Sequence, residues 1–350
     1  MKGLYITTSD LRTDSGGGKV SNHELNAMMK FTHRNASFYS SETVPFYNDP
    51  WFFDYWISNH LIIKEYDLVH FRGNPFISTY RVLRHFNDNI VSIVSVPAHD
   101  LERSIEEFKL LGLEYPYRHM TEPSLWDLYT LHIRKADMVI YPSKMSRDYL
   151  VKKLNLENKS RIIPHGCYPY PFELIKERYE EINDEPLRVG YIGALGPDKG
   201  ATYLINAVLG MENVELWLGG HSSVRLSYLS ERFSDKIKIY GTYATTWEFS
   251  KKIDVYVQPS ITEGFGLPVL EMMGCGVPVI VSKGAGVSEL VTEGMDGLKV
   301  PYRDIEAIKK AITYFKDHRD EVERMGKIAY RTSLNYTWDR IEDMLSLIHI

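Results

Sequence analysis

Short apolar runs recur along the chain, and each is followed by a longer stretch in which apolar residues return at helical spacing. Several runs are almost continuously apolar rather than alternating, which is typical of strands covered on both faces. Strands that alternate with helices predict parallel, doubly wound sheets. We expect strands at 3–8, 36–40, 67–71, 90–96, 138–142, 161–164, 188–192, 214–218, 236–240, 255–258, 278–282 and 298–300.

Two prolines mark a break near the middle of the chain. The run Tyr168-Pro169-Tyr170-Pro171 follows the sixth expected strand, and Pro continues neither a sheet nor a helix because it lacks the amide hydrogen. At 350 residues the chain is also longer than a typical single domain. We therefore expect two Rossmann-like domains, 1–170 and 171–335, with the linker at 166–186 and a closing helix over 336–350.

Composition narrows the class of protein. Hydrophobic residues make up 44% and charged residues 25%, which excludes a disordered chain, a collagen-like repeat and a disulfide scaffold. The net charge is -5 and neither half is basic, so we expect no nucleic-acid partner. Cys167 and Cys275 lie far apart in a chain without a signal-peptide pattern, so we expect free thiols and a cytoplasmic protein. No apolar run reaches ~18 residues, the length that spans a membrane.

Two loops of the first half could touch a ligand, because doubly wound sheets bind ligands at the carboxyl ends of their strands. The first strand leads into Gly16, Gly17 and Gly18 ahead of a helix, where backbone amides could approach a phosphate or a sugar. The alternative is a flexible turn. The fourth strand leads into His99 and Asp100, and the alternative there is a histidine satisfied by local hydrogen bonds.

A lysine in the second half stands where a diphosphate could bind. Lys199 lies in a glycine-rich turn ahead of a helix expected over 201–209. There it would neutralise an anion that the helix N-terminus also favours. The alternative is an exposed lysine on a turn.

The segment from Glu263 to Glu271 carries the most chemistry. It reads Glu-Gly-Phe-Gly-Leu-Pro-Val-Leu-Glu, and we expect a helix that begins near Leu267. The amides of 265–267 could then point at an anion. Glu271 could accept both hydroxyls of a ribose, and Glu263 could grip a sugar or orient a lysine. The alternative is one capping and one surface carboxylate.

The block Glu263–Ile280 resembles the signature of family 4 retaining glycosyltransferases, which have the GT-B fold. Weaker matches to that family follow in the expected order, at Gly16–Gly18, His99-Asp100, Ala136–Ser143, Ile163–Gly166 and Trp338.

The resemblance implies two Rossmann-like domains that face a cleft, with helix 336–350 crossing back to the first domain. It implies transfer of a sugar from a UDP- or GDP-sugar to a glycan, a lipid-linked or a small-molecule acceptor, with the anomeric configuration retained. Neither a metal nor another cofactor is expected, because a lysine and helix dipoles offset the leaving-group charge. The implied catalytic residues are His99, Glu263 and Lys199. The implied donor-binding residues are Gly17, Gly18, Lys199, Glu263, Gly264, Phe265, Gly266, Leu267 and Glu271.

One position departs from the family pattern. The family usually has Gly-Arg ahead of the lysine turn, whereas here Ala194 follows Gly193. Loss of that cation leaves open a slow enzyme, an unusual donor or lost activity, and the substitutes we consider are Lys19, Arg72 and Arg225. The competing functions are a sugar-nucleotide epimerase or hydrolase of the same fold, and a sugar-nucleotide binding protein without catalysis.

Two further features could bind a ligand or could have an ordinary structural role. A basic stretch over 144–155 could rest on the inner membrane surface, or could be an ordinary solvated helix face. An aromatic and acidic cluster over 46–56 could stack on a sugar, or could pack in a core.

Overall fold

The computed structural model of the chain describes residues 1–7, 16–34, 36–40, 50–60, 66–73, 76–96, 98, 100–116, 122, 126–128, 130–156, 159–180, 186–220, 231, 233, 235–241 and 245–348. The chain divides into two compact units. Unit 1 comprises Met1–Ala98, Tyr115–His165 and Trp338–Ile350, and unit 2 comprises His99–Glu114 and Gly166–Thr337.

This division differs from our expected boundaries in the segment 99–114, which we placed in the first domain and which belongs to unit 2. The physical reason is α4 (Leu101–Leu110), whose Glu107 is fully buried and pairs with Arg303 of unit 2. A buried carboxylate needs its partner, so the helix goes where Arg303 is. The order of elements along the chain carries no sign of this.

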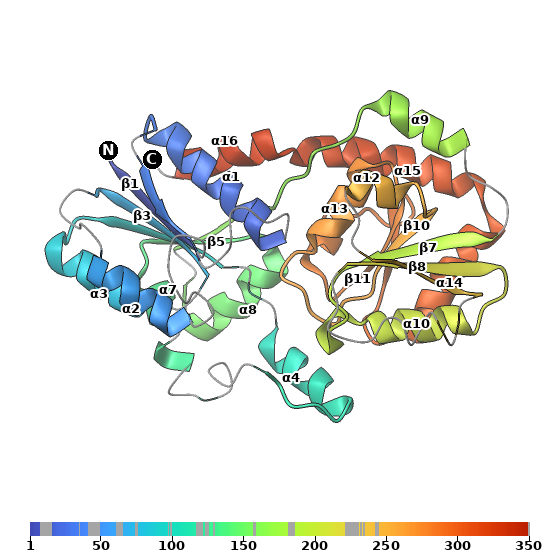
Figure 1. The fold of residues 1–350 in the computed structure, drawn as a ribbon, viewed down its shortest axis with the longest axis horizontal. Coiled ribbons are helices and arrows are strands. Elements are labelled where there is room, and N and C mark those ends of the chain that lie inside the picture. Colours follow the sequence, from blue (N-terminus) through green and yellow to red (C-terminus); the bar gives the residue numbers. More distant parts are fainter. Residues whose placement is uncertain are drawn as a thin grey trace. The chain divides into compact units, whose positions relative to one another are not determined.

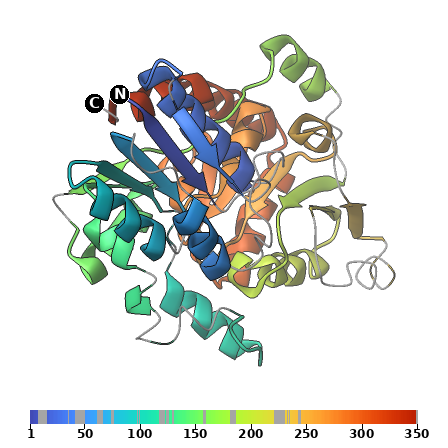
Figure 2. The ribbon, with the colours of Figure 1, turned by 60° about the vertical axis from the view of Figure 1, so that its left-hand side comes forward.

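Unit 1 is built on a six-stranded sheet in the order β2-β1-β3-β4-β5-β6, and every strand pair is parallel (Figure 2). Helices cover both faces: α1 packs on α16 on one side, and α2, α3 and α7 follow one another on the other (Figure 1). Its strands are β1 (Gly3–Thr7), β2 (Ala36–Tyr39), β3 (Leu68–Arg72), β4 (Val91–Ser95), β5 (Met138–Tyr141) and β6 (Ser160–Ile162). Its helices are α1 (Gly16–Phe31), α2 (Pro50–His60), α3 (Ile77–Phe86), α7 (Leu131–Lys135), α8 (Lys144–Leu154) and α16 (Trp338–Ile348).

Unit 2 has a second six-stranded parallel sheet, in the order β12-β11-β10-β7-β8-β9. Helices α10 and α14 pack together on one face, and α12, α13 and α15 on the other (Figure 1). Its strands are β7 (Leu187–Ile192), β8 (Val214–Gly219), β9 (Ile237–Gly241), β10 (Val255–Gln258), β11 (Val279–Ser282) and β12 (Gly297–Val300). Its helices, besides α4, are α9 (Phe172–Glu180), η3 (Pro197–Lys199), α10 (Ala201–Leu209), α12 (Thr246–Ser250), α13 (Leu267–Gly274), η4 (Gly286–Glu289), α14 (Ile305–Asp317), α15 (Asp320–Ser333) and η5 (Leu334–Tyr336).

The core of unit 2 explains its continuous apolar strands. Successive side chains of a strand point to opposite faces of the sheet. Val255 and Val257 belong to one hydrophobic cluster and Tyr256, between them, belongs to the other. Both faces of β10 are therefore buried, which is why an alternating pattern is absent from its sequence.

The strands expected from the sequence are confirmed, each within two residues at either end. The helix over 201–209 is confirmed at its own boundaries, and 144–155 forms α8. The segment that we expected to be the linker, 166–186, contains α9, which buries Ile175 and Arg178 against the rest of unit 2. In the part of the chain that the structure describes, no helix is long and apolar enough to cross a membrane.

Candidate functional site

The strand order of unit 2 shows where a ligand site belongs. Strands β7 and β10 are neighbours, but β7 leads to β8 on one side and β10 leads to β11 on the other. Such a reversal opens a crevice at the carboxyl ends of the two strands, where open α/β sheets bind ligands. The loops that follow β7 and β10 carry Lys199 and Glu263.

Backbone hydrogen bonds fasten these loops to each other. The Asp198 carbonyl accepts from the amide of Ile261 at 2.9 Å and from the amide of Thr262 at 3.3 Å. The Glu263 amide donates to the carbonyl of Gly284, in the loop after β11, at 2.9 Å. The loops after three neighbouring strands are thus hydrogen-bonded to one another, and two of them carry Lys199 and Glu263.

Glycine is required where the loops approach most closely. Gly200 has a φ of +69°, and a Cβ there would lie 2.2 Å from the carbonyl oxygen of Pro259. Any side chain would push the turn that carries Lys199 away from the loop after β10. The glycine-rich composition of this turn therefore serves close packing of two loops.

Lys199 and Glu263 form an ion pair. The ammonium contacts the Glu263 carboxylate and lies 3.5 Å from Oδ2 of Asp198. The two side chains of the pair are 25% and 26% exposed, so both are partly open to solvent. Burial lowers the pKa of Lys199, but the negative charges of Glu263 and Asp198 outweigh burial and raise it. Lys199 is therefore a cation at neutral pH.

Helix α13 begins beside this pair, at Leu267 as expected. Its N-cap is Gly266, with a φ of +104°, and a Cβ on that glycine would lie 3.7 Å from Cγ of Glu263. Phe265 and Leu267 are buried and anchor the helix start, while Glu271 is partly exposed one turn further along. Gly264, between Glu263 and Phe265, is buried as well. The expected residues of unit 2 are thus gathered around one helix N-terminus, which favours an anion.

A series of buried side-chain hydrogen bonds, which we did not predict from the sequence, lies at the start of the loop after β10. Tyr256 donates its hydroxyl to Oε1 of Gln258 at 2.7 Å, and Nε2 of Gln258 lies 2.7 Å from Oγ of Ser260. All three residues are buried. Gln258 and Ser260 stand at the end of a strand, and a polar residue at that place in an apolar run is the signal that could have found them.

Asp100, the residue after His99, is the N-cap of α4. Its carboxylate accepts from the amide of Arg103 at 3.0 Å and so caps α4, and it lies 3.2 Å from the Arg103 guanidinium. Aspartate is a preferred residue at a helix N-cap. His99 lies outside the described residues.

The other expected residues lie in unit 1 or outside the described chain. Gly17 and Gly18 stand in the first turn of α1. Of the candidate substitutes for the absent arginine, Lys19 is also in α1, and Arg225 is not among the described residues. The third, Arg72, is buried at the end of β3.

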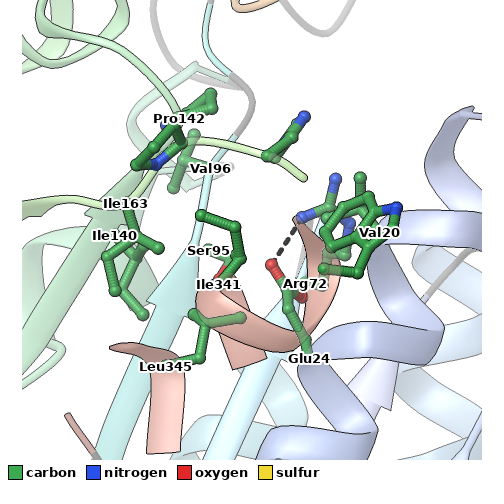
Figure 3. Close-up of a pocket in the computed structure, with 13 residues that line it drawn as sticks. Val20, Glu24, Arg72, Ser95, Val96, Ile140, Pro142, Ile163, Ile341 and Leu345 are labelled. Atoms are coloured by element: carbon green, nitrogen blue, oxygen red, sulfur yellow. Dashed lines mark hydrogen bonds and ion pairs between the residues drawn. The ribbon is translucent and has the colours of Figure 1, made fainter. Parts of the chain in front are cut away.

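Arg72 is part of a closed polar network in unit 1. Its Nη1 donates to Oε1 of Glu24 at 2.6 Å, and Tyr5 donates its hydroxyl to Oε2 of Glu24 at 2.7 Å. Figure 3 shows this pair on one wall of a small cavity, which is otherwise lined by apolar side chains and by the polar Ser95 and His165. The Glu24 carboxylate thus already neutralises Arg72.

Among the described residues, no group of three or more His, Cys, Asp and Glu side chains is arranged to hold a metal ion. At the switch point of the unit 2 sheet, the structure brings together the charges of Lys199, Glu263 and Asp198.

Two families match the two halves of the chain. Residues 173–332 match the family described as "Glycosyl transferases group 1", and residues 13–169 match the one described as "Glycosyltransferase Family 4". A relative from Methanocaldococcus jannaschii, named as an uncharacterized glycosyltransferase, is 29% identical over 153 residues. That alignment covers 39% of this chain and 39% of the relative, so the match spans well under half of the relative's length.

Two solved structures share the fold over the full chain. Sucrose-phosphate synthase from Thermosynechococcus elongatus superposes with a TM-score of 0.78 at 18% identity, covering 100% of this chain and 98% of that one. The HepE protein of Anabaena, solved in complex with UDP-glucose, superposes with a TM-score of 0.69 at 17% identity, covering 100% and 99%. From the matches over both halves, the two parallel sheets and these neighbours, the chain belongs to glycosyltransferase family 4 and has the GT-B fold.

Proposed function

We propose that this glycosyltransferase takes a nucleotide-diphosphate sugar, a UDP- or a GDP-sugar, at the unit 2 crevice and transfers the sugar with its anomeric configuration retained. The observation that carries the proposal is the Lys199–Glu263 pair beside the start of α13, at the topological switch point of the sheet. The bound UDP-glucose of the HepE structure supports the same class of donor.

Each group at the crevice has a role in the proposed reaction. Lys199 and the α13 N-terminus, with the amides of Phe265, Gly266 and Leu267, offset the charge that develops on the leaving diphosphate. Glu263 orients the lysine and contacts the donor sugar. The Glu271 carboxylate accepts the ribose hydroxyls, and Gly264 lets the backbone approach the donor.

Bond changes in the proposed step balance without a metal or a cofactor. The bond between the anomeric carbon and the diphosphate oxygen breaks, and a bond to the acceptor oxygen forms on the same face of the sugar. The acceptor hydroxyl gives its proton to the leaving diphosphate. In this proposal Gly17 and Gly18 contact the donor, and His99 contacts the donor sugar and the acceptor. The acceptor is a glycan, a lipid-linked sugar or a small molecule.

Ala194 favours a second candidate, a protein that binds sugar nucleotides without transferring the sugar, because one cation of the family pattern is absent. An epimerase or hydrolase is a third candidate on the same architecture. The products distinguish the three: a new glycosidic bond, a free or epimerised sugar, or an unchanged donor.

The test is incubation with a panel of UDP- and GDP-sugars and candidate acceptors, with products identified by NMR and nucleotide binding measured by calorimetry. We expect transfer that disappears in Glu263→Ala and persists in Glu306→Ala, an exposed carboxylate on α14. A panel without turnover and without nucleotide binding would contradict the proposal. Binding without turnover would favour the second candidate.

A further inference from the structure

Helix α4 comes from the first half of the sequence but contacts other elements of unit 2 at its start and near its middle. At its start, the amide of Asp100 donates to Oγ1 of Thr262 at 2.8 Å. One turn later, Nη1 of Arg103 lies 3.3 Å from the carbonyl oxygen of Ile261, and its guanidinium lies 4.4 Å from the centre of the Tyr302 ring. In the loop after β10, residues 259–266, which we call the donor loop, the residues that α4 contacts are therefore the two that immediately precede Glu263.

The middle of α4 is held by a buried charge. Glu107 is fully buried, accepts a hydrogen bond from the Tyr203 hydroxyl at 2.9 Å and accepts another from Nε of Arg303 at 2.6 Å. Tyr203 belongs to α10, the helix that follows Lys199. A buried carboxylate with two such partners fixes the position of the helix, because removing either partner leaves a buried charge with one hydrogen bond fewer.

Arg303 keeps a backbone conformation that arginine rarely adopts. Its φ is 61°, in the left-handed region that favours glycine. Such strain persists where the surroundings fix it. Here the side chain of Arg303 reaches Glu107 and, at 3.0 Å, the neighbouring Glu106. The strained residue is the one that holds α4 in place.

We infer that Glu107, Tyr203 and Arg303 are positioning residues for the Lys199–Glu263 site. They hold α4, and α4 contacts the Thr262 side chain and the Ile261 carbonyl, whereas the Asp198 carbonyl accepts from the amides of the same two residues. Without this helix, the donor loop keeps its bonds to Asp198 and Gly284 but loses its outer support. The inference rests on the proposed function for its effect on turnover, although the effect on the loop does not depend on it.

Two adjacent glutamates provide a matched pair of variants. Glu107→Gln removes the buried charge, and Glu106→Gln removes an exposed charge, 60% accessible, that pairs with the same arginine. Amide hydrogen exchange followed by mass spectrometry, on the full chain without ligand, reads peptides across 259–266. We expect exchange there about tenfold faster in Glu107→Gln and unchanged in Glu106→Gln, with the strands of unit 2 unaffected in both. Equal exchange in the two variants would overturn the inference.

Turnover separates positioning from a merely structural role. With the preferred nucleotide sugar we expect Glu107→Gln to lower kcat about tenfold while the Kd for the nucleoside diphosphate of that donor stays within about twofold, because the Lys199 turn keeps its own hydrogen bond, from the Lys199 amide to the Gly196 carbonyl at 3.0 Å. A parallel loss of nucleotide binding and of melting temperature would show that the residue is only structural. If Glu107→Gln does not fold, Tyr203→Phe removes one of the two hydrogen bonds and keeps the ring. If the wild-type chain turns over no donor, the proposed function fails, and the exchange comparison still decides the inference.

Discussion

Each of the two units has an ion pair at the switch point of its sheet, and the two pairs differ in their exposure to solvent. In unit 1 the strand order reverses between β1 and β3, and in unit 2 between β7 and β10. Each switch point holds a basic side chain paired with a glutamate: Arg72 with Glu24, and Lys199 with Glu263. The side chains of the first pair are 7% and 4% exposed, and those of the second 25% and 26%.

This difference shows that strand order alone does not make a ligand site: the charged groups at the switch point must also be accessible. In unit 1 the Glu24 carboxylate accepts hydrogen bonds from Arg72 and from the Tyr5 hydroxyl, and all three side chains are buried. In unit 2 the Lys199 side chain is 25% exposed beside a helix N-terminus, and in our proposal its ammonium exchanges the carboxylate partner for a diphosphate. We therefore expect the first pair to govern stability and the second to govern activity.

The largest effect tests the pair of unit 1. Glu24→Ala leaves the Arg72 guanidinium buried without a carboxylate, and we expect it to lower the free energy of unfolding by about 3–5 kcal/mol. Urea denaturation followed by circular dichroism measures this. The double variant Glu24→Leu/Arg72→Met is the control, because replacing both charges with apolar groups restores most of the loss. If Glu24→Ala costs no more than the double variant, the network does not carry the stability that we assign to it.

The pair of unit 2 gives the next effect, on activity instead of stability. Lys199→Ala removes the cation at the crevice, and we expect kcat with the preferred nucleotide sugar to fall by about 10²–10³-fold. The melting temperature should fall less than in Glu24→Ala, because the side chains of the unit 2 pair are more exposed than those of the unit 1 pair. Lys309→Ala, on the exposed side of α14, is the matched control and should keep full turnover. A Lys199→Ala variant that is unstable but as active as the wild type would invert the comparison.

A smaller effect concerns pH and belongs to unit 1. Burial, assisted by the positive charge of Arg72, lowers the pKa of His70 to about 3, and its Nε2 lies 2.7 Å from Oγ of Ser95. The folded state holds this histidine neutral, whereas the unfolded chain takes up a proton near pH 6.5. Stability from His70 is thus complete above about pH 6.5 and is lost as the pH falls from there toward 3.

The variant that checks this is His70→Gln, which keeps a hydrogen-bonding side chain and removes the titration. Between pH 7 and pH 5 we expect the wild type to lose about 2 kcal/mol more unfolding free energy than His70→Gln does. Urea unfolding at the two pH values gives both numbers. Parallel losses in the two proteins would mean that the histidine is protonated in the folded state.

The smallest effect sharpens the unit 2 side of the comparison. Ala194 stands after β7, where the family pattern has arginine, and its carbonyl accepts from the Tyr191 hydroxyl at 2.6 Å. That bond is made by the backbone, so Ala194→Arg can keep it. We expect the added cation to raise kcat/KM about tenfold. Turnover that appears only in this variant would instead favour the binding protein as the wild-type function.

Much of the fold follows from local patterns in the sequence. Continuous apolar runs predicted the strands, since a strand buried on both faces leaves no polar position. Pro268 and the glycines ahead of it predicted the start of α13, because both residue types suit a helix N-terminus. These signals lie within a few residues of each other and need no knowledge of the rest of the chain.

The sequence by itself determined the two sheets, the family and the residues Lys199, Glu263 and Glu271 as candidates. Only the tertiary structure decided which charged side chains are buried and which are partly exposed. It also decided that Arg72 pairs with Glu24, and that α4 belongs to unit 2 through the pair of Glu107 and Arg303. The physical reason is separation along the chain. A glutamate and an arginine 196 positions apart leave no mark on each other's local pattern, and burial makes them partners only when the fold brings them together.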